Sequence, residues 1–276
     1  MSDNIIYFTL DFENDLGSAL KDKTYYSIDH IEELIDILSH YNIPLTAFCE
    51  GEIIEKLPYK IEPLINIQAE IELHGYNHDS AFSSLENKVD NLMHGLDAYS
   101  SHFGNMPNGY RAPNGMINFN ELTILNNNHI KYDSSIFPSY FPGRFNNSKY
   151  PKVPFGYKEL DIIELPFSVT QGFIAIPISL SYIQLLGKSI FSFIANKNQL
   201  PNRIVFDFHM HDIIEGIYYD KGNSYFERFG YSIINMKNKK KYFEDIINWL
   251  FSLGYKPKYL SELYSESVLD KDLLLI

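Results

Sequence analysis

The sequence contains only one cysteine, Cys49, and only one tryptophan, Trp249. A single cysteine cannot form an intramolecular disulfide, so a disulfide-stabilised extracellular scaffold is excluded. Basic residues are also scarce, since 23 Lys and Arg face 35 Asp and Glu and the formal net charge is −12. An acidic chain repels phosphate backbones, and the largest basic cluster is the short run at 237–241. Nucleic acid is therefore not expected as a partner.

Long hydrophobic runs are missing as well. Nowhere do 18 apolar residues follow one another, so we expect no membrane span. The N-terminus leads into a short apolar segment at 5–10 without a basic stretch before it, which predicts no signal peptide and a cytoplasmic location. The apolar tail at 273–276 is too short to cross a bilayer, and we expect it to pack on the body or on a partner.

Hydrophobic residues make up 45% of the 276 residues, and aromatic residues make up 15%. This supply is sufficient for one large core, and the length fits a single-domain α/β barrel. We therefore expect residues 1–276 to form one domain.

Short apolar segments alternate with helical patterns along the chain, and no segment repeats. The expected strands are 5–10, 45–48, 71–73, 109–111, 130–132, 162–165, 204–208 and 256–259. The expected helices are 31–38, with Ser27 as its cap, 85–103, 119–127, 182–195 and 241–253. This alternation favours one α/β domain with a mostly parallel sheet or barrel.

Reactive side chains recur at the ends of these expected strands. Each lies at or just past the C-terminal end of a strand: Asp11, His74, Arg111, Asp133 and His209. In parallel barrels this rim carries the active site, because its loops vary without disturbing the core. We therefore expect these five side chains to converge.

His74 and His78 are the clearest metal signal. They stand four positions apart after a strand, and Gly75 permits a sharp turn between them. Two such imidazoles can converge on one ion, and imidazole suits Zn, Co, Ni or Fe. A pair of surface or capping histidines is the alternative at this spacing alone.

Asp11 and Glu13 follow the first strand and share one face if the extended chain continues. One carboxylate can then bind a metal while the other accepts a proton from water. Capping of a turn at the strand end is the alternative interpretation.

Arg111 lies in a stiff segment between Gly109 and Gly115, where its guanidinium can pair with Asp11 and orient it. A structural arginine that ties two loops together is an equally good interpretation of this segment alone.

The last polar motif alternates along a strand. Asp207, His209 and His211 are expected on one side of it, with Phe206 and Phe208 on the other. A histidine here can protonate a leaving amine, although a hydrogen-bonded histidine at a strand end fits equally well without the other motifs.

Taken in order, these motifs resemble the polysaccharide deacetylase family, also called carbohydrate esterase family 4, whose domain is an irregular (β/α) barrel. Segments 9–13, 74–78, 111–113 and 206–209 resemble its first, second, third and last motifs. Segments 109–113, 132–138 and 164–166 resemble the branch found beside exopolysaccharide gene clusters. The resemblance runs from about residue 5 to about residue 265.

The resemblance implies a single distorted (β/α) barrel of about seven strands and a metal-dependent hydrolase. Such an enzyme removes an N-acetyl or other acyl group from an amino sugar in surface-glycan biosynthesis. One divalent ion, zinc before others, would be held by Glu13, His74 and His78. Asp11 would act as the base and Arg111 would orient it. The substrate is an acetylated amino sugar, which is free, nucleotide-linked, lipid-linked or part of a glycan.

The resemblance also assigns the remaining residues. His209 would be the acid, and Asp133 would tune it. The backbone N–H of Asn114 would contribute to an oxyanion hole. His211 would hold His209 or bind substrate, and we expect it farther along the strand, toward solvent.

The sequence departs from the family in its first motif, in its third motif, where Asn114 stands in place of an aromatic residue, in the missing tryptophan of the fourth motif, and in a long insert. The family usually has Asp-Asp or Asp-x-Asp in its first motif, whereas this chain has Asp-x-Glu, and Asp15 is the alternative ligand to Glu13. The insert 138–157 is expected to form one wall of the cleft with Tyr140, Phe141 and Tyr150, or else to fold on its own aromatic rings. Two rival functions are a ureide or cyclic-amide hydrolase with a similar site and a catalytically inactive sugar-binding pseudoenzyme.

Overall fold

The computed structural model describes residues 3–15, 23–80, 84–141, 145–217 and 235–276. Its main sheet has ten strands in the order β10-β1-β2-β3-β4-β5-β9-β8-β12, with β11 also paired to β1. These strands are β1 (Ile5–Phe12), β2 (Leu45–Cys49), β3 (Glu70–Leu73), β4 (Gly109–Tyr110), β5 (Tyr132–Asp133), β8 (Phe155–Gly156), β9 (Ile163–Glu164), β10 (Arg203–His209), β11 (Lys256–Pro257) and β12 (Leu274–Leu275). The paired strands of this sheet are parallel except β8 and β9, and a second, antiparallel sheet consists of β6 (Tyr140–Phe141) and β7 (Phe145–Asn146). The curled sheet confirms the expected distorted (β/α) barrel.

The strands at the centre of the sheet are apolar on both faces. Every residue of β1 is buried, and the strand is composed mainly of β-branched and aromatic residues. Strands of this kind form where helices cover both sides of a parallel sheet. In register, Asp11 stands opposite His209 of β10, so the C-terminal ends of these two strands are level.

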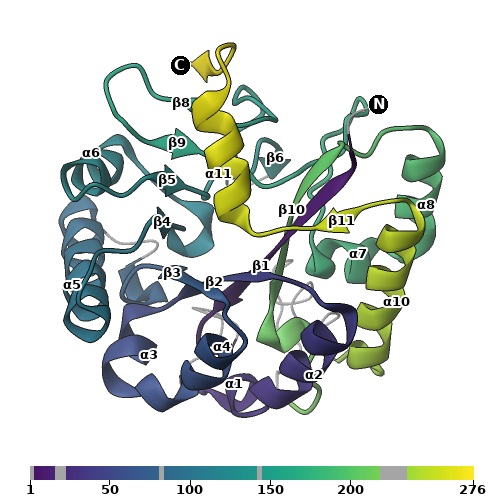
Figure 1. Ribbon diagram of the computed structural model, residues 1–276, viewed down its shortest axis with the longest axis horizontal. Helices are drawn as coiled ribbons and strands as arrows, with labels where there is room; N and C mark the ends of the chain where they lie inside the picture. Colours follow the sequence, from purple (N-terminus) through teal and green to yellow (C-terminus); the bar gives the residue numbers. More distant parts are fainter. Residues whose placement is uncertain (1–2, 16–22, 81–83, 142–144, 218–234) are drawn as a thin grey trace.

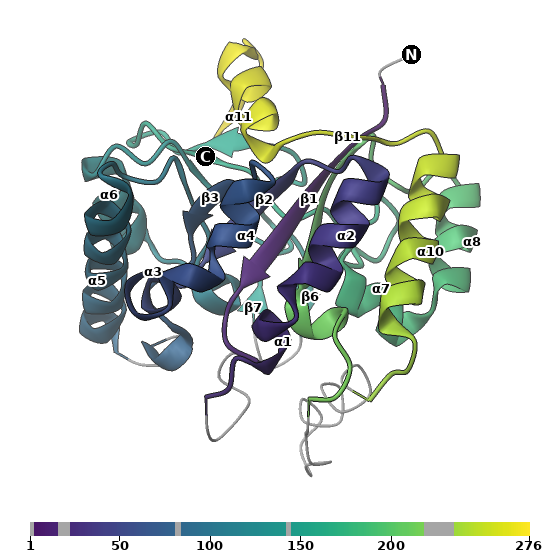
Figure 2. The same cartoon turned by 60° about the horizontal axis from the view of Figure 1, so that its bottom comes forward.

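Helices surround the curved sheet, and the last of them covers one end of the barrel (Figures 1 and 2). They are α1 (Tyr26–Asp29), α2 (Ile31–Tyr41), α3 (Gly51–Lys56), α4 (Glu62–Asn66), α5 (Leu85–Phe103), α6 (Phe119–Asn127), α7 (Leu180–Leu186), α8 (Lys188–Asn196), α10 (Lys239–Ser252) and α11 (Leu260–Leu269). Helix α5 has the expected bounds because the Ser84 side chain caps its start and Gly104, with φ 75°, ends it. Helix α6 begins with a capping box formed by Asn118 and Glu121.

Two expectations about helices were wrong. Segment 182–195 is not one helix, because Gly187, at φ 87° and ψ 140°, separates α7 from α8. Ser27 lies inside α1 rather than capping the next helix. Its hydroxyl donates to Asp15, and Asp15 also accepts from the backbone N–H groups of Tyr26 and Ser27.

The C-terminal segment differs from the expected strand at 256–259. Only Lys256–Pro257 pairs with β1, and helix α11, which the sequence did not predict, follows at once. The apolar tail then pairs through β12 with β8, so it packs on the body of the protein. No helix within the described ranges is long and apolar enough to cross a bilayer.

Candidate active site

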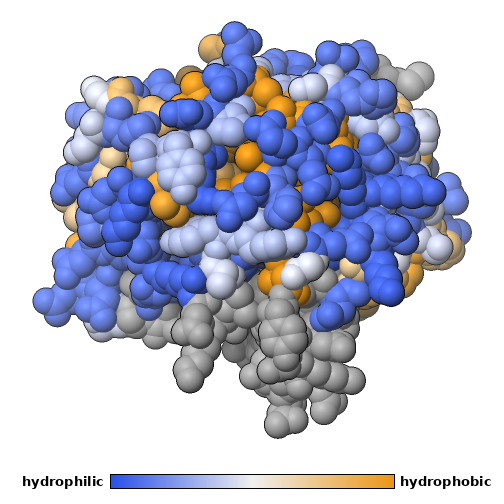
Figure 3. Space-filling model, turned by 90° about the horizontal axis from the view of Figure 1, so that it is seen from below, coloured by the Kyte–Doolittle hydropathy of each residue, from blue (hydrophilic) through white to orange (hydrophobic). Residues whose placement is uncertain are grey.

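The polar side chains gather where the strands end. Asp11 belongs to β1 and Glu13 follows it, while His74 and Arg111 follow β3 and β4, and His209 ends β10. In Figure 2 these strand ends lie toward the bottom, at the end of the barrel opposite α11, and Figure 3 shows the molecule from the side of α1, α2, α3 and α4. The visible part of this face is mainly hydrophilic, with apolar groups exposed in its middle (Figure 3).

Glu13, His74 and His78 form a compact set of possible metal ligands. Glu13 Oε2 lies 2.8 Å from His78 Nε2 and 3.3 Å from His74 Nε2. One ligand atom from each of the three lies within 4.8 Å of the other two, and all three residues are buried. This is the spacing that one ion with ligand bonds of about 2.1 Å requires.

Hydrogen bonds at the other ring nitrogens orient both imidazoles. His74 Nδ1 lies 2.8 Å from the carbonyl oxygen of Arg111, and His78 Nδ1 lies 2.9 Å from Glu50 Oε1. The carbonyl oxygen can only accept, so His74 Nδ1 carries a proton, and Glu50 Oε1 is a matching acceptor for a proton on His78 Nδ1. Each Nε2 lone pair then points into the set, which is the arrangement that metal-binding histidines require.

The buried polar atoms also fit a cation. Glu13 Oε2 and His74 Nε2 are buried, yet neither forms a well-directed hydrogen bond with any described residue. Burial raises the pKa of Glu13, but His78 and His74 outweigh this effect and hold it well below its usual range. A buried anion beside two imidazole lone pairs suits a divalent ion with mixed nitrogen and oxygen ligands.

Asp15, the alternative ligand, is engaged elsewhere. Its carboxylate accepts hydrogen bonds from Thr24, Tyr26 and Ser27 at the start of α1. The sets of possible metal ligands among the described residues do not include it. Its role in the structure is therefore to cap α1.

Arg111 is fully buried and ties three elements together. Its Nη1 lies 2.6 Å from Asp11 Oδ1 and 2.9 Å from Asp207 Oδ1, and its Nε donates to the Ser134 carbonyl oxygen. The guanidinium is also stacked against the rings of Phe48 and Phe167, at 4.1 and 4.2 Å. The contact with Asp11 is the one that the sequence suggested.

The shared arginine affects its two carboxylates differently. Burial raises the pKa of Asp11, but Arg111 and His74 together lower it below its usual value. Burial and the neighbouring charge of Asp11 raise the pKa of Asp207 to about 7. Asp11 is thus held ionised, as a proton acceptor must be.

His209 points toward the two carboxylates at the end of β1. Its Nε2 lies 3.8 Å from Asp11 Oδ2 and 3.9 Å from Glu13 Oε1, and its Nδ1 lies 3.3 Å from Asp212 Oδ2. Burial disfavours its charged form, but Asp207 and Asp212 hold the pKa of His209 well above its usual range. His209 therefore carries a proton that it can donate.

The expectation that His211 lies farther along the strand, toward solvent, was wrong. The strand ends at His209, and a 3-10 turn at Met210–Asp212 follows. The turn folds the His211 ring back onto His209, with ring centres 4.7 Å apart. His211 is 12% exposed and His209 is 23% exposed, and burial lowers the pKa of His211 to about 4.

Asp133 does not contact His209 in the described structure, and Asp212 takes the place that we expected for it. Asp133 accepts a hydrogen bond from Ser135 Oγ, and that hydroxyl in turn accepts from the backbone N–H of Ala112. Burial raises the pKa of both Asp133 and its neighbour Glu164. Asp133 therefore holds the loop that follows Arg111.

That loop carries Asn114. It is a 3-10 turn at Pro113–Gly115, and Asn114 adopts the left-handed conformation, with φ 58° and ψ 14°. Asparagine tolerates this conformation better than most residues. The contribution of its backbone N–H to an oxyanion hole stays a prediction.

The two ends of the insert 138–157 have different neighbours. At one end, Phe137 lies against Gly115 and is stacked on Phe167. At the other, the Tyr150 ring is stacked on Phe155, as the self-packing alternative requires. Tyr140 is 63% exposed, whereas the side chain of Phe141 lies outside the described part of the structure.

Sequence reasoning overlooked Glu50. It is fully buried just after β2, accepts from the backbone N–H of Asn14, and contacts His78. The rule that singled out the other strand ends applies to it as well, because it directly follows Cys49 at the same rim.

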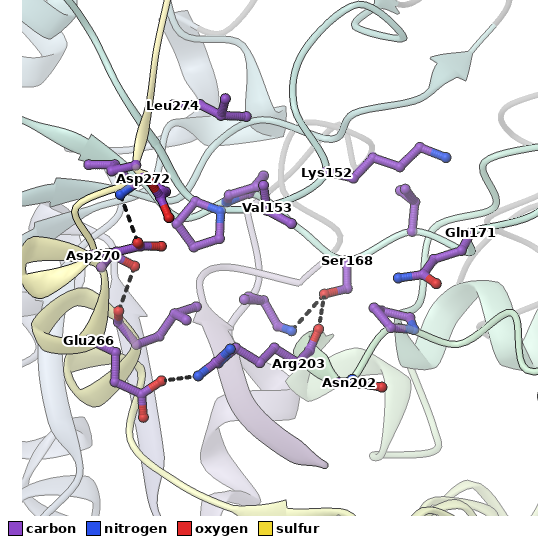
Figure 4. A pocket seen from close by; sticks show the side chains of 18 residues that line it. Lys152, Val153, Ser168, Gln171, Asn202, Arg203, Glu266, Asp270, Asp272 and Leu274 are labelled. Carbon is purple, nitrogen blue, oxygen red and sulfur yellow. Dashed lines mark hydrogen bonds and ion pairs between the residues drawn. The ribbon is translucent and has the colours of Figure 1, made fainter. Parts of the chain in front are cut away.

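A pocket of about 690 Å³ lies away from this site (Figure 4). It is lined by Arg203 and Val205 at the start of β10, by Leu274 of β12 and by Leu263 of α11. Among the described strands, β10 and β12 are the two edges of the sheet that do not pair with each other. The pocket thus occupies the open seam at the opposite end of β10 from His209.

The fold and the site together define the class of the protein: a barrel with candidate metal ligands and acid–base residues at the C-terminal rim. Residues 14–132 match the family model for polysaccharide deacetylase. This range includes His74, His78 and Arg111. This part of the chain is therefore similar to the polysaccharide deacetylase family.

Known proteins and solved structures are similar to this chain over part or most of its length. A peptidoglycan deacetylase of Helicobacter pylori (strain ATCC 700392 / 26695) is 26% identical over 114 residues, which cover 40% of this chain and only 38% of the relative. A probable polysaccharide deacetylase of Pseudomonas aeruginosa PAO1 has a similar structure, with a TM-score of 0.65, 12% identity, and coverage of 98% of this chain and 92% of that one. An allantoinase structure matches with a TM-score of 0.63, 11% identity, and coverage of 95% and 90%. At such identities these two structures support the fold alone.

Proposed function

We propose that the protein is a metal-dependent hydrolase that removes the acetyl group from an N-acetylated amino sugar. The observation that carries this proposal is the orientation of His74 and His78. The Nδ1 atom of His74 lies within hydrogen-bond distance of the Arg111 carbonyl oxygen, and that of His78 lies within hydrogen-bond distance of Glu50. Both Nε2 atoms therefore face Glu13, and each can bind a metal ion through its lone pair. Two imidazoles and one carboxylate favour zinc among the common ions.

A divalent ion bound by Glu13, His74 and His78 would polarise the amide carbonyl and make water acidic enough to react near neutral pH. The other residues of the site handle protons. Asp11, kept ionised by Arg111, accepts a proton from the attacking water. Arg111 fixes the direction of the Asp11 carboxylate and is itself held by Ser134.

His209 acts on the other side of the reaction. Its ring faces Asp11 and Glu13, and Asp207 and Asp212 keep it protonated. It donates this proton to the departing amine, so that acetate and a free amino sugar leave. His211, whose pKa is lowered to about 4, is neutral at the same pH and fits a role in packing against His209.

The experiment is release of acetate from N-acetylglucosamine, from its short oligomers and from a nucleotide-linked form, by the full chain supplied with zinc. We expect acetate and free amine in equal amounts with at least one of these substrates. An Asp11→Asn variant serves as the matched control for contaminating activity.

Two results would contradict the proposal. Hydrolysis of a cyclic ureide without activity on any acetylated sugar would support the ureide hydrolase instead. Binding of the sugars without release of acetate, with the metal in place, would support a pseudoenzyme.

A further inference from the structure

Helix α8 and the turn that lies against it expose an unusual amount of apolar surface. Four side chains project from them: Phe173 is 106% exposed, Ile174 69%, Ile190 44% and Phe193 63%. Exposed apolar side chains that occur singly need no explanation, whereas a group of them on one surface marks an interaction site. With Lys188 and Lys197, we call this group the α8 surface.

Hydrogen bonding and packing bring the two parts of this surface together. The backbone N–H of Gln171 donates to the carbonyl oxygen of Gln199, 2.8 Å away, just after α8 ends. A Cβ added to Gly172 would lie 2.9 Å from the Gln199 side chain, so the turn rests directly against this segment. The turn with Phe173 and Ile174 therefore stands beside the C-terminal end of α8.

One side of α8 packs against the core, and another side is exposed to solvent. Phe191 and Ile194 are buried, whereas Ile190 and Phe193 are exposed. Positions 190, 193 and 197 fall on one side of a helix, and Lys197 Nζ lies 5.6 Å from the centre of the Phe193 ring. A helix that is apolar on its outer side as well as its inner side lies against something other than water.

The charge around this surface is the opposite of that of the whole chain. The chain has a formal net charge of −12, yet residues 165–206 contain no Asp or Glu and include Lys188, Lys197 and Arg203, the last of which is paired with Glu266. Helix α10, which contacts α7 and α8 through Tyr242, carries Asp245 on its exposed side, with Lys241 one turn before it. Those two charges offset each other, and Lys188 and Lys197 are the charged side chains of the α8 surface itself.

We propose that the α8 surface docks onto an anionic lipid bilayer, with Phe173, Ile174 and Phe193 in the interface and the lysines against the headgroups. Aromatic and aliphatic side chains flanked by lysine are what an interfacial helix presents to such a membrane. A second copy of the chain fits less well, because a symmetric contact would place the lysines of both copies together. Docking in this way does not depend on catalysis.

The experiment is flotation of the full chain with two kinds of vesicle, phosphatidylcholine alone and a mixture of phosphatidylcholine and phosphatidylglycerol. We expect binding to the mixed vesicles that weakens with salt, and little binding to phosphatidylcholine alone. The double variant Phe173→Ser with Phe193→Ser should bind at least about tenfold more weakly. Phe119→Ser is the matched control, because Phe119 is 54% exposed at the start of α6.

The charge is tested by Lys188→Glu with Lys197→Glu, which should abolish the preference for phosphatidylglycerol. Lys131→Glu with Lys158→Glu, at exposed positions outside this surface, is the control of equal charge and should keep it. Circular dichroism verifies that each variant is folded.

The proposal is overturned by absence of binding, by equal binding to both kinds of vesicle, or by binding that the Phe173 and Phe193 changes leave intact. It is also overturned if these changes abolish only self-association, seen by light scattering.

Discussion

Arg111 holds Asp11 and Asp207 with the same nitrogen, Nη1, which lies 2.6 Å from one carboxylate and 2.9 Å from the other. The two aspartates come from adjacent strands, so the guanidinium joins the base of the proposed reaction to the strand that carries His209. Two more of its donors, Nε and Nη2, are used by the carbonyl oxygen and the hydroxyl of Ser134.

Arg111→Lys should therefore be a poor substitution. An ammonium group cannot reach both aspartates and Ser134 with the fixed geometry of a guanidinium. We expect turnover to fall by about 10²-fold or more, because Asp11 loses its fixed direction, while the metal content stays near that of the unchanged chain. Full activity in a folded Arg111→Lys protein would show that Arg111 does not orient the base.

Glu50 should set the metal affinity without binding the metal. It is buried and orients His78 through Nδ1, and loss of such a partner typically weakens metal binding about 10- to 100-fold. Glu50→Gln should raise the dissociation constant for zinc by this factor in a competition titration with a chelator. Glu55→Gln, which removes a carboxylate from the neighbouring helix α3, should leave it unchanged. Equal affinities for the Glu50→Gln protein and the unchanged chain would exclude this role.

The two histidines after β10 should behave differently. His209 reaches toward Asp11 and Glu13, whereas His211 is stacked on His209. His209→Ala should reduce turnover by about 10²- to 10⁴-fold as a missing general acid, and His211→Ala should reduce it much less. Steady-state kinetics on an acetylated amino sugar measures both. A reversed order would make His211 the acid.

Glu121 makes folding stability depend on pH. Burial raises its pKa from 4.5 to about 7. Between these values the folded chain holds a proton that the unfolded chain has released, so its contribution to the free energy of unfolding falls as pH rises. Glu121→Gln keeps the capping box with Asn118 but cannot titrate. Urea unfolding at pH values between these two pKa values should therefore show that the free energy of unfolding depends less on pH in Glu121→Gln than in the unchanged chain. Identical slopes for the two proteins would contradict the prediction.

The sequence indicated most of the sheet because buried parallel strands appear as uninterrupted apolar runs, as in β1. It also indicated α5 closely, since Ser84 and Gly104 mark its ends. The break at Gly187 was not predictable in the same way. Glycine is tolerated inside helical patterns, and only the backbone conformation shows that α7 and α8 are separate.

Prediction of the site from the sequence was limited in a similar way. Asp11, His74, Arg111 and His209 could be grouped because strand ends converge in a barrel. The partner of His209 could not be identified, because that depends on strand order. Strand β5 pairs with β9, which puts Asp133 opposite Glu164, whereas His209 stands opposite Asp11.

His211 was misplaced for a related reason. Alternation along a strand holds only while the strand continues, and this one ends at His209. The 3-10 turn that follows brings Asp212 next to His209. The Asp212 carboxylate accepts a hydrogen bond from the His209 backbone N–H at 2.9 Å.

The measurement that bears most directly on this account is the amount of divalent ion bound per chain, determined by equilibrium dialysis and elemental analysis after loading with zinc. The account predicts one ion per chain in the unchanged protein and in Asp11→Asn, which loses turnover but no ligand. His74→Ala and His78→Ala should each lose the ion, and Glu13→Gln should bind it more weakly. Retention of one tightly bound ion when both histidines are replaced, or no binding by the unchanged protein, would contradict the proposed site.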